Sequence, residues 1–156
     1  MKLYFDTSFV NYLFAEDTPL KMADTLALWE DILQGKYEVF LSDTTIIEIE
    51  KCDDPRLSLM KEKLSEIEYT HIANNAEIKA LASQYIKNKI LPAKSELDSM
   101  HIASAAYAEC DMIVSWNFKH LVNVRTNDGV RYVNKVNNYK EIQIVSPNML
   151  VANPKS

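Results

Sequence analysis

Four polar residues spread along the chain have side chains that could do chemistry together. They are Asp6, Glu48, Asp98 and Asn117, three carboxylates and one amide. Carboxylates brought together repel one another, and some would be forced to take up protons unless a divalent cation relieves the repulsion. Oxygen ligands of this kind suit Mg²⁺ or Mn²⁺ rather than zinc. Such ions lower the pKa of a bound water and stabilise charge on a phosphodiester, so the four residues predict metal-dependent phosphodiester hydrolysis if they meet.

Each of these residues also has a purely structural interpretation as a helix cap. Asp6 can cap the helix that follows it, and Asn117 can cap a short helix after a strand. Residues 45–48 have the Thr-x-x-Glu spacing of a capping box, and residues 95–98 have the similar Ser-x-x-Asp spacing. Taken singly, none of the four therefore establishes a site.

Apolar and aromatic runs alternate with helical patterns along the chain. The predicted strands are residues 2–5, 37–41, 68–72, 112–115 and 141–145. The predicted helices are residues 7–14, 20–33, 46–52, 56–67, 75–87, 95–108 and 125–139, with a helical turn or two at 117–122. In the last helix we expect Val130, Val133 and Val136 to face inward. Strands separated by helices imply crossover connections and a mostly parallel sheet.

This topology places the four polar residues at one edge of the sheet. Asp6 and Asn117 directly follow strands, Glu48 lies in about the first turn after a strand, and Asp98 lies in the first turn of a helix. Crossover helices run antiparallel to the strands, so each helix begins at the carboxyl edge, where open α/β sheets form their ligand crevices. We therefore expect the four residues to meet there.

Length and composition limit the other function classes. A chain of 156 residues predicts one domain, which we place at residues 1–146, followed by a tail at 147–156. With only two glycines, neither GxGxxG nor a GxxxxGK(S/T) phosphate loop can be built. Two distant cysteines argue against structural zinc and, with no signal pattern or spanning apolar run, predict a cytoplasmic protein without a membrane segment. The net charge of −5 argues against broad, nonspecific nucleic-acid binding.

Several segments resemble the PIN-domain ribonucleases, especially the VapC-like toxins of bacterial toxin–antitoxin pairs. They are FDTSFVN, LSDTTIIEIE, LDSMHIASAAYAECD and IVSWNFKHL, in this order between residues 5 and 121, and VNKVNNYKEIQIVSP resembles the closing strand region of one bacterial subgroup. The resemblance implies a three-layer α/β/α fold with a central, mostly parallel sheet. It also implies Mg²⁺- or Mn²⁺-dependent endoribonuclease activity on RNA, and a homodimer held by an antitoxin protein.

The resemblance also implies roles for single residues. Asp6 matches the first acid of the family, and Asp98 matches the acid that opens the small-residue helix. Glu48 matches the acid on the helix after the second strand, with Glu50 as the competing choice. These three acids are the expected metal ligands.

The region around Asn117 departs from the family pattern. Asn117 stands where many members carry a fourth acid, so one negative charge is missing and the number of metal ions, one or two, stays open. Ser115 matches the hydroxyl residue two positions earlier and is a supporting candidate. Lys119 and His120 can contact a phosphate or simply lie at the surface.

Other polar and aromatic residues near these positions each have two interpretations. His101, one helical turn from Asp98, can touch the site, but a polar residue at the helix–sheet boundary is favoured. Trp116 can stack on a base, but packing is favoured. Thr7 and Ser8 can hold a metal-bound water, but capping of the first helix is favoured.

Two rival functions remain from the sequence. The first is a catalytically weak PIN scaffold that binds a protein or RNA partner, which the neutral Asn117 and the acidic balance favour. The second is a doubly wound domain in which the acids serve only as caps.

Overall fold

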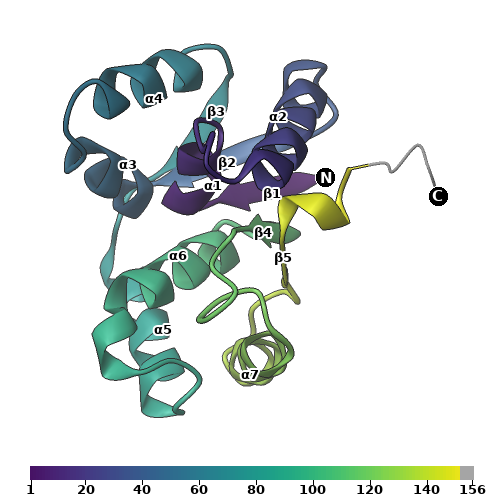
Figure 1. The fold of residues 1–156 in the computed structure, drawn as a ribbon. Coiled ribbons are helices and arrows are strands. Elements are labelled where there is room, and N and C mark those ends of the chain that lie inside the picture. Colours follow the sequence, from purple (N-terminus) through teal and green to yellow (C-terminus); the bar gives the residue numbers. More distant parts are fainter. Residues whose placement is uncertain (152–156) are drawn as a thin grey trace.

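Five parallel strands form a single sheet in the computed structural model, which describes residues 1–151 (Figure 1). The strands are β1 (Lys2–Phe5), β2 (Glu38–Ser42), β3 (Tyr69–Ile72), β4 (Met112–Val114) and β5 (Gln143–Val145). Their order is β3-β2-β1-β4-β5, and Leu3 of β1 is in register with Val39 on one side and Met112 on the other. All five predicted strands are confirmed, with bounds that differ by one or two residues.

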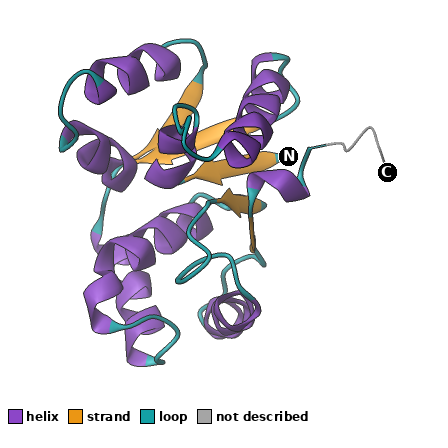
Figure 2. Cartoon of the chain, viewed as in Figure 1, coloured by secondary structure: helices purple, strands orange, loops and turns teal. Residues whose placement is uncertain are grey.

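Helices cover both faces of the sheet (Figures 1 and 2). One layer contains α1 (Thr7–Tyr12), α2 (Pro19–Leu33), α3 (Asp43–Glu50) and α4 (Arg56–Leu64). The other contains α5 (Ala76–Lys87), α6 (Glu96–Tyr107) and α7 (Val124–Val136), with short 3-10 turns η1 (Ala93–Ser95) and η2 (Pro147–Met149) elsewhere. The predicted three-layer α/β/α architecture with a parallel sheet is confirmed.

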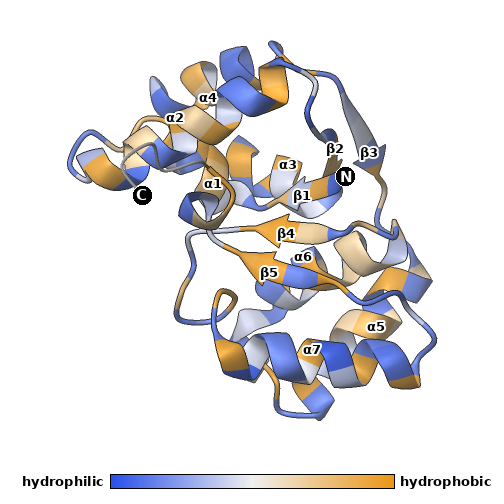
Figure 3. Cartoon of the chain, turned by 90° about the vertical axis from the view of Figure 1, so that its right-hand side faces the viewer, coloured by the Kyte–Doolittle hydropathy of each residue, from blue (hydrophilic) through white to orange (hydrophobic). Residues whose placement is uncertain are grey.

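The central strand explains why both faces must be covered. Leu3, Tyr4 and Phe5 of β1 are fully buried; Leu3 and Phe5 belong to the core beneath α1 and α2, and Tyr4 belongs to the core against α5 and α6. A strand buried on both faces reads as a continuous apolar run, as this one does. The apolar residues of β4 and β5 lie between the same two layers (Figure 3).

Residues 117–122 form the expected helical turn but no longer helix, with the amides of Leu121 and Val122 both donating to the Asn117 carbonyl. One local prediction was wrong. In α7, Val130 and Val133 are buried but Val136 is 62% exposed. A step of three residues falls about 60° short of a full helical turn, so a series with this spacing moves off the buried face.

Neither predicted capping box forms. Ser42, the last residue of β2, caps α3 by accepting a hydrogen bond from the Thr45 amide, which places Thr45 inside the helix. Ser95 makes no side-chain capping bond at the start of α6. Glu48 and Asp98 are therefore not members of capping boxes, which leaves both carboxylates for other interactions.

The region after β5 partly falls within the described residues. η2 lies against α2, and Leu150 and Val151 pack on the core of that layer, whereas residues 152–156 of the predicted tail lie outside the described residues. Within residues 1–151, no helix is long and apolar enough to cross a membrane.

Gly129 in the middle of α7 allows the loop after α5 to pack closely. A Cβ at this position would lie 2.3 Å from Cδ1 of Ile90 and 2.8 Å from its Cγ2. Gly129→Ala should therefore lower the free energy of unfolding by about 1 kcal/mol, because overpacking of about 1–3 kcal/mol outweighs a helix-propensity gain of about 1 kcal/mol. Urea unfolding followed by circular dichroism measures the change.

The control is a double-mutant cycle with Ile90→Ala. Removing the Ile90 side chain should make Gly129→Ala neutral or stabilising, because the clash is gone and the propensity gain remains. A Gly129→Ala variant that is more stable than the parent protein would show that Ile90 moves aside without cost.

Candidate functional site

Asp6 lies where β1 ends and serves as the cap of α1. Its Oδ1 accepts hydrogen bonds from the Phe9 amide at 3.2 Å and the Ser8 hydroxyl at 2.6 Å, and its Oδ2 accepts one from the Ser115 hydroxyl at 2.6 Å. The side chain is buried, with 4% of the residue exposed. Burial raises the pKa of Asp6, while the positive charge of His101 and the two hydroxyls oppose the rise. The capping interpretation of Asp6 is confirmed, and both oxygens have partners.

Two serines join the ends of β1 and β4 around this carboxylate. Ser8 accepts a hydrogen bond from the Trp116 amide at 2.9 Å, and Ser115 accepts one from the Asn117 amide at 2.9 Å. The two hydroxyl oxygens are 3.3 Å apart. Ser115, a supporting candidate from the sequence, thus contacts Asp6 directly. Ser8 was expected to cap the first helix, and this was wrong, because the carboxylate of Asp6 takes that position.

Glu48 projects from α3 toward the same edge of the sheet. Its Oε1 accepts hydrogen bonds from the Thr7 hydroxyl at 3.0 Å and from Nε2 of His101 at 2.5 Å. Burial alone would raise the pKa of Glu48, but the hydrogen bond and charge of His101, with the Thr7 hydroxyl, hold that pKa below its usual value. Glu48 is therefore ionised at neutral pH. Thr7, like Ser8, orients an acid instead of capping the helix.

His101 lies at the centre of this cluster, with 2% of the residue exposed. Its Nδ1 is 2.5 Å from the Tyr4 hydroxyl, which is also 2.7 Å from the Ser42 hydroxyl. Burial alone would lower the pKa of His101, but the hydrogen bond to Glu48 and the nearby carboxylates raise it. The surrounding carboxylates therefore favour the protonated form of His101. His101 does lie at the helix–sheet boundary, as expected, and it also contacts a predicted site residue.

Asp98, in the first turn of α6, differs from the other two acids. Its carboxylate accepts no hydrogen bond from any residue between 1 and 151, and the residue is only partly buried. Burial raises the pKa of Asp98; the negative charges of Asp6 and Glu48 also raise it, while His101 and His120 lower it. The three acids therefore lie close enough to influence one another's protonation, although they come from distant parts of the chain.

The carboxylate oxygens of Asp6, Glu48 and Asp98 are suitable ligands for a hard cation such as Mg²⁺. They are not, however, arranged around a common metal position. In the described part of the chain, no three His, Cys, Asp or Glu side chains are placed to hold a metal ion. The Asp6 oxygens and Oε1 of Glu48 already accept hydrogen bonds, which leaves the Asp98 carboxylate and Oε2 of Glu48 without one. Three acids with one imidazolium leave negative charge that Mg²⁺ or Mn²⁺ would balance.

The segment after β4 forms the rim of the site. The Oδ1 of Asn117 accepts a hydrogen bond from the His120 amide at 3.0 Å, so this side chain caps the turn as one interpretation expected. Trp116 packs, with 6% exposed and its Nε1 donating to the Thr25 hydroxyl, which confirms the favoured interpretation. Lys119 is exposed, and His120 is partly buried near Asp98.

Sequence reasoning missed Tyr4 and gave too little weight to His101. A tyrosine within a buried, otherwise apolar strand was the signal for Tyr4, because a buried phenol needs a hydrogen-bond partner. The signal for His101 was its three-residue spacing from Asp98, which puts both on one face of a helix.

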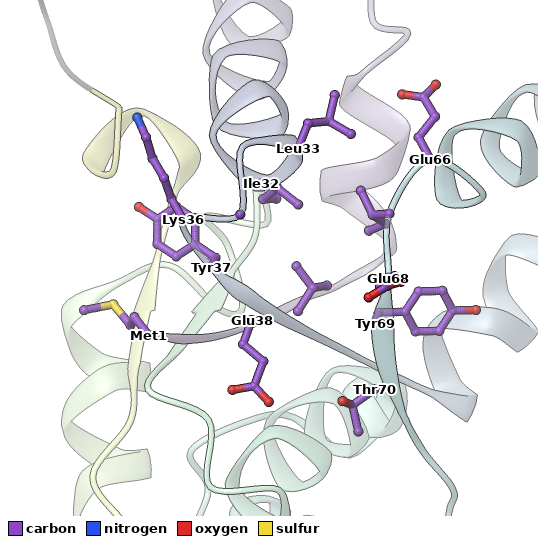
Figure 4. Close-up of a pocket in the computed structure, with 13 residues that line it drawn as sticks. Met1, Ile32, Leu33, Lys36, Tyr37, Glu38, Glu66, Glu68, Tyr69 and Thr70 are labelled. Carbon is purple, nitrogen blue, oxygen red and sulfur yellow. The ribbon is translucent and has the colours of Figure 1, made fainter.

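Away from the acid cluster, a hollow of about 800 Å³ lies at the opposite, amino edge of the sheet (Figure 4). Met1, Glu38 and Tyr69, near the starts of β1, β2 and β3, line it together with Glu66 and other residues. The Oε1 of Glu66 accepts a hydrogen bond from Trp29, so this acid has a structural role. The predicted site residues do not line this hollow, and it is separate from the acid cluster.

The raised pKa of His101 predicts a specific pH dependence of stability. A group whose pKa is raised on folding stabilises the protein fully below its unfolded pKa, near 6.5 for histidine, and this contribution is lost as pH rises through the folded pKa. His101→Gln should therefore reduce the free energy of unfolding most near pH 6, and the difference from the parent protein should shrink toward alkaline pH. Urea unfolding in EDTA across this range measures it.

His71→Gln provides the matched control, because His71 is exposed on β3 and pairs with Asp43. A His101→Gln effect of the same size at all pH values would show that His101 contributes only a neutral hydrogen bond.

No family model and no curated protein matches the chain. Among solved structures, the chain is similar to one in the crystal structure of VapBC2 from Rickettsia felis bound to a DNA fragment from their promoter. The TM-score is 0.60 at 12% sequence identity, and the match covers 94% of this chain and 98% of that one. Together with the all-parallel sheet and its two helical layers, this similarity shows that the chain has a PIN-like α/β/α fold.

Proposed function

We propose that the chain is a metal-dependent endoribonuclease that hydrolyses RNA phosphodiester bonds and acts as the toxin of a type II toxin–antitoxin pair. The observation that carries this proposal is the contact of buried His101 with Glu48 at the carboxyl edge of the sheet, where the charges of Asp6, Glu48 and Asp98 all raise the pKa of His101. The similarity of fold to a chain of a VapBC complex supports it. Acids that served only as caps would not need to converge.

In this proposal Asp6, Glu48 and Asp98 hold Mg²⁺ or Mn²⁺. When bound, such an ion would supply a water of lowered pKa and stabilisation of negative charge on the phosphodiester. The chain itself orients the acids: Ser8 and Ser115 hold Asp6, while Thr7 and His101 hold Glu48. Hydrogen bonds of this kind fix the direction of ligand oxygens and tune their basicity. Asp98 accepts no hydrogen bond from residues 1–151, so none of these residues restrains its turn toward a cation.

Partner and location follow from the same proposal. The similar structure contains an antitoxin-type complex, VapBC2 on promoter DNA, and we infer that this chain also binds an antitoxin protein and forms a homodimer. Cys52 and Cys110 are free thiols, which suits the reducing cytoplasm.

A second candidate is a catalytically weak PIN scaffold that binds a protein or RNA partner. The specific observation that favours it is the absence, within residues 1–151, of three side chains already placed to hold a metal ion. The Asn117 amide oxygen, which is engaged in a turn, adds to this. A binding scaffold needs no metal, so metal titration separates the two candidates.

Asp98→Asn is the variant that tests the proposed chemistry. It should weaken Mn²⁺ binding in calorimetric titration and reduce cleavage of a fluorescent RNA with Mn²⁺ by more than the roughly 10–100-fold that loss of an outer-shell partner costs. The fold should be retained, because Asp98 accepts no hydrogen bond from the described residues.

Asp128→Asn is the matched control, since Asp128 is an exposed acid on α7 whose only described ion pair is with Arg131. It should leave binding and cleavage unchanged. If the parent protein binds neither Mn²⁺ nor Mg²⁺ and cleaves no RNA, the scaffold candidate replaces the nuclease.

A further inference from the structure

A pocket of about 790 Å³ lies beside the acid cluster. One wall is the segment that leaves α5, and the other is the segment between β4 and the first turn of α7. His120 lines this pocket, and its amide donates a hydrogen bond to Oδ1 of Asn117 on the rim of the site, so the pocket adjoins that rim.

The charge of this pocket contrasts with that of the whole chain. Lys89, Lys119 and Arg125 line it, and no carboxylate does. Within residues 1–151, none of these three cations forms an ion pair, although Lys36, Lys61, Lys63, Arg131 and Lys140 do. Unpaired positive charge gathered in one hollow of a chain with net charge −5 indicates an anionic ligand.

An aromatic ring stands between the pocket and the rest of the rim. Phe118 lines the pocket and is 45% exposed. Its ring packs edge-on against Trp116, with centroids 5.9 Å apart, and the Lys21 ammonium lies 5.3 Å from its centroid. Trp116 is fixed by its own hydrogen bond, so Phe118 rests on a rigid support. An exposed, supported ring of this kind stacks on nucleic-acid bases whatever their sequence.

The walls of the pocket are held in place by the fold. Ile90 packs directly onto Gly129 of α7, and the Arg125 guanidinium donates a hydrogen bond to the Lys89 carbonyl at 3.4 Å. These contacts join the segment after α5 to α7. The cations therefore line a site that exists before any ligand binds, which reduces the entropy lost on binding.

We propose that this pocket binds single-stranded RNA beside the cleavage position, with Lys89, Lys119 and Arg125 contacting phosphates and Phe118 stacking on a base. The proposal rests on the proposed function for the nature of the substrate and adds the place where the strand is held. A nucleotide matches both features of the pocket, cationic groups and a flat apolar ring. An acidic peptide or free phosphate matches only the charge.

A pair of matched double variants tests the phosphate contacts. Lys89→Gln with Lys119→Gln is compared with Lys79→Gln with Lys135→Gln, which removes the same charge from exposed sites on α5 and α7 that do not line the pocket. Fluorescence anisotropy in EDTA, where a metal-dependent enzyme does not turn over, measures binding of an unstructured RNA of about 12 nucleotides.

The pocket variant should raise the dissociation constant about tenfold and reduce the slope of log K against log salt by about 1.4, from two lost contacts to a single strand. The control pair should change the dissociation constant less than about twofold, since its lysines act only through net charge. Equal weakening by both pairs, or no RNA binding by the parent protein, would overturn the proposal.

Phe118→Leu tests the stacking contact, with Tyr132→Leu on exposed α7 as its control. Loss of one stacked base should weaken RNA binding at least about fivefold, while binding of inorganic polyphosphate stays unchanged. If polyphosphate or polyglutamate displaces the RNA at equal charge concentration and Phe118→Leu has no effect, the pocket is only a general anion site and the proposal is wrong.

A parallel cleavage assay with Mn²⁺ separates this inference from the proposed function. If RNA binds and its binding depends on the pocket residues, but no RNA is cleaved, the nuclease proposal is wrong and the RNA-binding site is supported. If the Lys89→Gln, Lys119→Gln variant cleaves RNA with an unchanged KM, the nuclease proposal is supported and the RNA-binding site is wrong.

Discussion

The hydrogen bond between His101 and Glu48 is the interaction on which the site depends. It joins α6 to α3 across the end of β1, and Tyr4 of β1 completes the chain of contacts on the other ring nitrogen. A buried charge is costly unless it is paired and hydrogen-bonded, and here both nitrogens of the imidazole have partners. The same contact fixes the direction of Glu48. Without it, Nε2 of the buried His101 would lose its hydrogen-bond partner.

Strand order explains how residues so distant in sequence reach this point. β1 is the middle strand, between β2 and β4, so the end of β1 is next to the ends of both neighbours. Asp6 follows β1 and meets Ser115 after β4, while Glu48 is carried by the helix that follows β2. Asp98 arrives from the opposite layer on α6. Asp6 therefore acts both as the cap of α1 and as one of the converging acids, and the two interpretations from the sequence are compatible.

The strands and helices were predictable because their signals are local. The apolar run of β1 and the cap residue Asn75 of α5 show in a few neighbouring residues. The role of His101 was not predictable, because its partners Tyr4 and Glu48 lie 97 and 53 residues away. Ser42 rather than Thr45 caps α3, and the same residue is in register with Ile72 of β3 as the last residue of β2. The spacing of residues along the sequence does not reveal contacts between residues that are distant in the chain.

The distribution of charge reconciles an acidic chain with the proposed nucleic-acid substrate. A net charge of −5 argues against a broad basic surface, but it averages over groups that do different things. Three of the acids converge at the sheet edge, and other acids on the surface neutralise lysines and arginines far from it. Lys89 after α5, Lys119 after β4 and Arg125 in the first turn of α7 line one pocket, and none of them forms an ion pair with another residue between 1 and 151. In the proposed RNA complex, this local positive charge attracts the strand while the net negative charge of the chain disfavours binding over the whole surface, which favours selective rather than general binding.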